Sequence, residues 1–187
     1  MAQRGLSIVE LLVAITIAAI LLGAAVPSMR MLVAESQLDA TMRRLHASIQ
    51  LTRTAAVQFR RIATLCPQGG RLDAARRHCG ADWSAGYHVF VDRNGDAMLD
   101  TDIDTLLLVE PPDDAVRLSW RAFRRRAALQ FRADGATHLS NGTFTLCSAR
   151  VASDSLDHVH GGVRRLVINV GGRTRTERNG EHAALCD

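Results

Sequence analysis

Arginines gather near the C-terminal end of the chain, in the segment VRRLVINVGGRTRTERNG. Arg173 and Arg175 are two residues apart, so their side chains point the same way if the chain is extended. The Gly171-Gly172 pair before them lets the backbone turn and approach a ligand closely. Such a pair suits a phosphate backbone, which it holds without reading base sequence. We expect these two arginines to contact double-stranded DNA, assisted by Arg164, Arg165 and Arg178; the alternative is a solvated hairpin with ordinary surface arginines.

The overall charge does not by itself indicate a nucleic-acid partner. The net charge is +4, and every basic residue is an arginine. The positions of the arginines must therefore carry the argument. Arg124 to Arg126 form a second cluster that the sequence does not place on any face, and Glu177 and Glu181 dilute the charge of the first.

A short acidic segment resembles the start of a calcium loop. Asp92, Asn94 and Asp96 occupy the first, third and fifth places of an EF-hand-like pattern. Ala97 then replaces the loop glycine, and Ile103 stands where the bidentate acid belongs. We therefore favour a hairpin turn rich in Asp and Asn, and keep calcium as the alternative.

No catalytic arrangement is visible in the sequence. His158 and His160 could share a strand face, but they lie in a polar segment typical of an exposed loop. No serine has a G-x-S-x-G setting. We expect neither an enzyme nor a bound cofactor or metal.

The four cysteines favour disulfides, as expected for an exported chain. Three pairings are possible. We favour a local Cys66–Cys79 bridge and a Cys147–Cys186 bridge that ties the C-terminus to a strand. Zinc is the alternative, although the chain has no C-x-x-C pair.

One long helix followed by strands must position these groups. From Ser28 to Arg61 apolar residues recur at helical spacing, and Cys66-Pro67 should end the helix. Beyond it, short alternating runs separated by Asn-Gly, Asp-Gly and Gly-Gly turns predict an α+β fold with the helix against antiparallel sheet. The apolar stripe consists of Leu38, Met42, Leu45, Ile49, Ala56 and Phe59, and the expected strands are 87–91, 105–110, 116–120, 128–131, 143–148 and 163–170.

The N-terminal run from Leu6 to Val26 is long enough, at roughly 31 Å as a helix, to cross a bilayer. It could be a plain anchor or a secretory signal peptide with a cleavage site at Gly23-Ala24-Ala25. Two features argue against the signal peptide: Glu10 lies where its apolar region should begin, and helical character continues beyond the cleavage site. A carboxylate inside an apolar run is also costly in lipid, so Glu10 needs a partner.

The segment RGLSIVE resembles the prepilin signal of type IV pilins and type II secretion pseudopilins. The resemblance implies cleavage after Gly5 by a prepilin peptidase and methylation of the new terminal residue, Leu6. It also implies that Glu10 pairs with the terminal amine of a neighbouring subunit during assembly, which would offset the cost of burying it. Pro27 falls where many pilins have a helix-kinking proline.

The rest of the chain resembles the GspH/FimT group of minor pilins. Members of that group often have an aromatic residue, a Val-Phe strand, an Asp-x-Asn turn and another strand, as in the segment WSAGYHVFVDRNGDAMLDTDIDTLLL. In addition, GRTR, from Gly172 to Arg175, matches the G-R-x-R motif of its DNA-binding members. The resemblance implies DNA capture in natural transformation; the alternatives are a structural minor pilin that primes assembly and a type II secretion pseudopilin.

The expected partners are major and minor pilins. The expected location is the inner membrane, with the C-terminal domain in the periplasm, and then the pilus. The expected regions are a leader (1–5), a transmembrane and assembly helix (6–27), its amphipathic continuation (28–61) and a β-rich domain (62–187).

Overall fold

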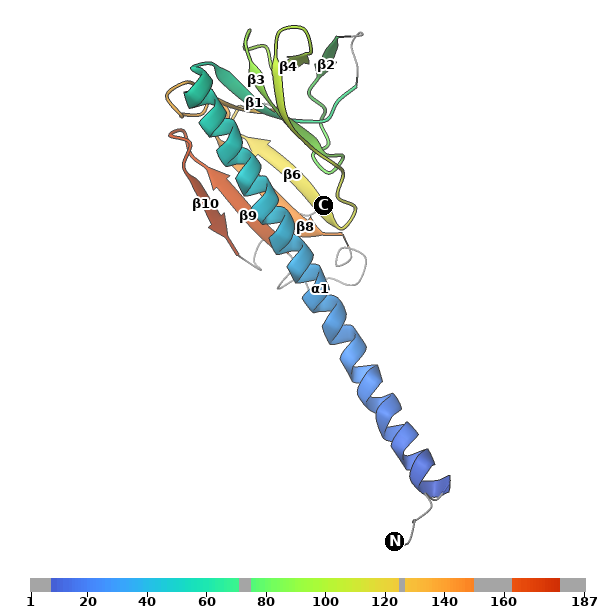
Figure 1. The fold of residues 1–187 in the computed structure, drawn as a ribbon. Helices are drawn as coiled ribbons and strands as arrows, with labels where there is room; N and C mark the ends of the chain where they lie inside the picture. The colour runs from blue at the N-terminus through green and yellow to red at the C-terminus, as the bar shows by residue number, and fades with distance from the viewer. Residues whose placement is uncertain (1–7, 71–74, 125–126, 150–162, 179–187) are drawn as a thin grey trace, which may run out of the picture.

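A long N-terminal helix and a series of antiparallel strands form the protein in this computed structural model (Figure 1). The structure describes residues 8–70, 75–124, 127–149 and 163–178. The elements are α1 (Ile8–Phe59), β1 (Ile62–Pro67), β2 (Arg76–His78), β3 (Tyr87–Asp92), β4 (Met98–Asp100), β5 (Thr105–Glu110), β6 (Val116–Ala122), β7 (Leu129–Phe131), β8 (Gly142–Ser148), β9 (Val163–Ile168) and β10 (Thr174–Glu177).

Helix α1 runs without interruption through Pro27. Its N-terminal half projects away from the strands, and its C-terminal half lies along them (Figure 1). Glu10 lies in the first turn, among exposed apolar side chains. Within the described residues, no helix combines the length and apolar character needed to cross a membrane. Gly5 and Leu6 lie outside the described residues.

Two four-stranded antiparallel sheets pack against the C-terminal half of α1. Their strand orders are β5-β3-β1-β7 and β10-β9-β8-β6, and β2 and β4 form a separate two-stranded ribbon. The predicted helix stripe enters one core with side chains from both sheets, and Leu38, Leu45 and Ile49 are completely buried there. Phe59 is the exception in that stripe: it is 47% exposed, because it is the last residue of the helix. The predicted α+β architecture is confirmed.

The junction between helix and sheet differs from the sequence prediction. The helix ends at Phe59 rather than Arg61, and β1 starts almost at once. Cys66-Pro67 therefore ends a strand, not the helix. The strand pairs with β3 on one side and β7 on the other, so it is central and buried. A central strand is apolar on both faces, and periodicity does not separate such a run from a buried helix.

The local disulfide prediction is confirmed. Cys66 at the end of β1 is bonded to Cys79, just after β2, with a sequence separation of 13 residues. These two sulfurs are therefore not zinc ligands. Cys147 is buried on β8, and its predicted partner Cys186 lies outside the described residues.

Candidate functional site

The β9–β10 hairpin carries the arginine segment, and its turn has a defined geometry. The Gly172 N–H donates to the carbonyl of Asn169 at 3.0 Å, and the Asn169 N–H donates to the carbonyl of Arg173 at 3.1 Å. Gly172 has a φ of 74°, as in a three-residue hairpin loop that closes with a left-handed glycine. A Cβ at Gly172 would lie 2.3 Å from the carbonyl oxygen of Gly135. The turn therefore requires glycine at position 172.

Contacts with the helix and with a neighbouring turn fix the tip of this hairpin. Arg53 on α1 donates to the carbonyl of Gly172 at 3.3 Å and to that of Gly171 at 3.4 Å. The Thr137 N–H donates to the carbonyl of Val170 at 2.9 Å. In Figure 1 the tip lies at the end of the domain where α1 ends, far from the N-terminus. Arg173 therefore extends from an anchored backbone.

Strand pleating places Arg175 on the face of the sheet that points away from α1. Thr174, one residue earlier, faces the helix, where its hydroxyl lies 2.9 Å from Nε2 of His46. Side chains alternate along a strand, so Arg175 points outward, and its side chain is 75% exposed. Arg173 is also exposed, and within the described residues its guanidinium has no hydrogen bond or ion pair. These two side chains are the accessible pair that the sequence predicted.

Arg164 differs from the expectation, because it faces the helix. It is 8% exposed, and its Nε donates to Oδ1 of Asp39 on α1 at 2.9 Å. Arg178 reaches the other oxygen of Asp39 at 3.3 Å but stays largely exposed. Arg164 thus holds β9 against α1, and DNA would have to break a buried ion pair to reach it.

Glu177 joins the two remaining arginines. Its Oε2 accepts a hydrogen bond from Nη1 of Arg165 at 3.0 Å, and its Oε1 accepts one from Arg175. Because Arg175 is mostly exposed, its pair with Glu177 contributes only about 0–1 kcal/mol. A phosphate can therefore compete for Arg175, whereas the side chain of Arg165 is only 22% exposed.

The sequence analysis missed Arg121, which shares the outer face with Arg175. Arg121 on β6 is opposite Thr143, Thr143 is opposite Val167, and Val167 is opposite Arg175. The four residues thus form one row across the sheet. The alternation of apolar and polar residues from Val116 to Ala122 was the available signal.

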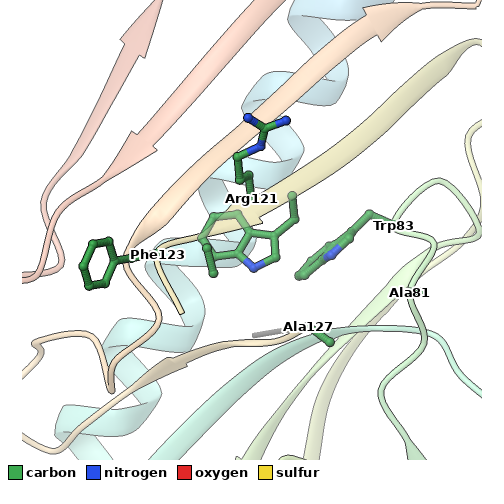
Figure 2. A pocket seen from close by; sticks show the side chains of 7 residues that line it. Ala81, Trp83, Arg121, Phe123 and Ala127 are labelled. Carbon is green, nitrogen blue, oxygen red and sulfur yellow. The ribbon is translucent and has the colours of Figure 1, made fainter. Parts of the chain in front are cut away.

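A hollow of about 660 Å³ opens beside Arg121 at the end of β6 (Figure 2). Trp83 forms one wall and stacks edge-on against Phe144 in the core, with ring centroids 4.7 Å apart. In Figure 2 the Arg121 guanidinium points away from Trp83, and Phe123 stands apart from both. No titratable pair converges there among the lining residues, so we assign this hollow no chemistry.

The acidic turn after β3 is held by its own hydrogen bonds. Asp92 is 1% exposed, and burial raises the pKa of its carboxyl. Its oxygens accept from the N–H groups of Gly95 and Ala97, the hydroxyl of Thr64 and the amide of Gln130. Within the described part of the chain, no group of three acids, histidines or cysteines could hold a metal. The hydrogen bonds account for Asp92 as a turn residue.

Several other residues singled out in the sequence lie outside the described residues: Arg125, Arg126, His158, His160 and Glu181.

Comparisons with known proteins identify the family. Residues 1–26 match the prokaryotic N-terminal methylation motif. Residues 41–172, most of the chain, match the family described as type II transport protein GspH. The chain belongs to the GspH family. No curated protein matches it significantly.

The type IV minor pilin FimU of Pseudomonas aeruginosa has the same fold as this GspH-family chain. One crystal form is 23% identical, with a TM-score of 0.52 over 76% of this chain and 89% of that chain. A second form gives 23% identity and a TM-score of 0.46 over 77% and 90%. The predicted resemblance to GspH/FimT minor pilins and the predicted pilin fold are confirmed.

Membership of the GspH family indicates a minor pilin or pseudopilin. Such proteins are structural subunits, and membership implies association with other pilins in a fibre. The prepilin-like N-terminal motif suggests anchoring in the inner membrane before assembly.

Proposed function

We propose that this minor pilin captures extracellular double-stranded DNA through the β9–β10 hairpin, for uptake in natural transformation. Arg173 and Arg175 make the first phosphate contacts, and Arg178, which pairs with Asp39 on the helix side but is 74% exposed, assists them. Arg165, opposite Glu177 on the same face of the sheet as Arg175, adds positive charge, while Arg164 holds the strand to the helix. Contacts to phosphates alone carry no base sequence, so binding is sequence-independent.

The observation that carries this proposal is the pair of exposed arginines on a rigid turn. Arg175 is 75% exposed, and Arg173 has no ion pair among the described residues. The backbone beneath them is fixed by Arg53 and by the left-handed Gly172. Because this backbone is already fixed, less conformational entropy is lost when the two side chains bind a phosphate.

Processing and assembly at the N-terminus complete the proposal. A prepilin peptidase cuts after Gly5, and Leu6 becomes the methylated terminus. The segment 6–27 anchors the chain in the inner membrane and later packs into the fibre, where Glu10 pairs with the amine of a neighbouring subunit. The motif match over residues 1–26 supports this sequence of events.

Titration of labelled duplex DNA with the full chain in a non-ionic detergent tests the DNA site. The variant Arg173→Ala, Arg175→Ala should lose most of the binding. The variant Arg43→Ala, Arg77→Ala removes the same charge from exposed arginines elsewhere and should bind as the wild type does. The slope of log affinity against log salt should fall by roughly 0.9 for each phosphate that the variant no longer neutralises. Equal losses in both variants would mean that net charge, not this hairpin, attracts DNA.

A second candidate function is a structural role in a type II secretion pseudopilus or in priming a type IV pilus. The family description, type II transport protein, favours the first of these and FimU, a type IV minor pilin, the second. Deleting the gene separates the roles. Lost secretion indicates the pseudopilus, lost pili indicate priming, and lost transformation with intact pili indicates DNA capture.

A further inference from the structure

A second basic feature lies at the same end of the domain as the hairpin tip. It is an open hollow of about 370 Å³, formed where three chain segments meet. The segments are the junction between α1 and β1, the turn after β3 and the turn after β7 (Figure 1). Its basic lining residues are Arg60, Arg61, Arg93, Arg132 and His138.

Acidic groups also lie near these arginines, and Asp104 Oδ1 accepts a hydrogen bond from the Arg93 N–H at 2.9 Å. Asp92 is the carboxyl among the residues that line the hollow, and its oxygens are buried and hydrogen-bonded inward. Arg132 pairs with Asp134 at 2.6 Å, but both side chains are more than half exposed. Within the described residues, Arg60, Arg61 and Arg93 have no side-chain ion pair. Among the residues that line the hollow, four arginines stand against one carboxyl.

Arg60 stands in a backbone position that normally favours glycine. Its φ is 52°, and its N–H donates to Val57 while that of Arg61 donates to Ala56, as in a Schellman helix end. A basic residue here does interact favourably with the helix dipole. That effect accounts for charge at the end of α1, but not for Arg93 and Arg132, which come from other segments.

The hollow and the arginine hairpin adjoin each other. The turn that carries Arg132 also contains Gly135, whose carbonyl oxygen packs directly against Gly172. Arg173 follows Gly172 in sequence and therefore starts beside that turn. The exposed arginines of the hairpin and of the hollow thus belong to one end of the domain.

We propose that this hollow is a second phosphate site for the same DNA that contacts Arg173 and Arg175. The inference rests on the proposed function, and it extends the DNA footprint from the hairpin across the end of the domain. Guanidinium groups from separate segments suit a phosphate diester, since each presents a planar fork of donors. No group in the hollow needs to reach a base, so the second site adds affinity and not sequence preference.

The variant Arg60→Gly, Arg93→Gln tests the second site without disturbing the fold. Glycine suits the left-handed position better than arginine does, so thermal stability should not fall. Arg43→Gln, Arg77→Gln removes the same charge away from the hollow and is the matched control. Each full chain in non-ionic detergent is titrated against labelled duplex DNA over a series of salt concentrations.

We expect the hollow variant to bind about tenfold more weakly and its salt slope to fall by about 2, since each neutralised phosphate accounts for roughly 0.9 of the slope. The control should keep the wild-type slope. If the hollow variant binds as the wild type does while Arg173→Ala, Arg175→Ala loses binding, the hairpin acts alone and the second site is refuted. If the wild type itself does not bind, the proposed DNA capture fails, and this inference fails with it.

Discussion

Replacing Gly172 by alanine tests whether the arginine hairpin depends on the geometry of its turn. An L-residue held at a φ of 74° costs about 1–2 kcal/mol. The new Cβ would also lie 2.3 Å from the carbonyl oxygen of Gly135 and 3.0 Å from the ring of Phe131. Relieving such a contact costs about 1–3 kcal/mol. We therefore expect a loss of about 3 kcal/mol, which for a chain of this size lowers Tm by roughly 6–12 °C.

The adjacent glycine provides a matched control. Gly171 has no positive φ, and a Cβ there would meet nothing closer than Asn169 Oδ1 at 3.5 Å. Thermal unfolding of the full chain in detergent can be followed by the fluorescence of Trp83, which lies in the core. Gly171→Ala should melt close to the wild type. The reasoning is refuted if Gly172→Ala also melts within about 2 °C of the wild type, or if both variants fall equally.

The remaining predictions concern stability away from the turn. Asp39→Ala should cost about 2–4 kcal/mol in denaturant unfolding, because it removes the carboxylate that the buried Arg164 bonds at 2.9 Å. The double variant Cys66→Ala, Cys79→Ala should lower the free energy of unfolding by about 3 kcal/mol in the same measurement. Without the disulfide, the loop that it closes gains conformational entropy in the unfolded chain. Burial lowers the pKa of His88 to about 4, so the unfolded chain binds the extra proton between pH 6.5 and 4. The neutral ring therefore contributes fully to the free energy of unfolding above pH 6.5, and this contribution falls by up to about 3 kcal/mol toward pH 4. In His88→Gln the free energy of unfolding should depend less on pH over this range than in the wild type.

The sequence was sufficient for the elements whose pattern is periodic. The helix stripe around Leu45 and Ile49 and the strand that begins at Val116 were predictable because burial alternates with a fixed period there. The strand from Ile62 to Pro67 was missed because it is buried along nearly its whole length and starts almost directly after α1, so its apolar run could not be separated from a continuing helix. The short β2 and β4 ribbon depends on the Cys66–Cys79 disulfide region rather than on its own pattern.

The candidate site was predictable in its residue types but not in its contacts. The exposed pair at Arg173 and Arg175 follows from local spacing and from the glycines. The burial of Arg164 against Asp39 joins residues from β9 and α1 that are far apart in the sequence. No local pattern contains such a contact, so the sequence could not separate Arg164 from Arg165. The same limit hid Arg53, which caps the hairpin from the helix.

Helix α1 joins the segment proposed for assembly to the hairpin proposed for DNA binding, and it also separates them. Its C-terminal half supplies Arg53 to the hairpin tip and Asp39 to the other end of the hairpin, and Arg60 follows the helix directly. Its N-terminal end, with Glu10, lies far away, since 52 helical residues extend over roughly 78 Å. Substitutions at Glu10 should therefore act on assembly alone, and substitutions at Arg173 on ligand binding alone. Because α1 is one continuous helix, its packing in a fibre would also fix the direction in which the arginine end faces.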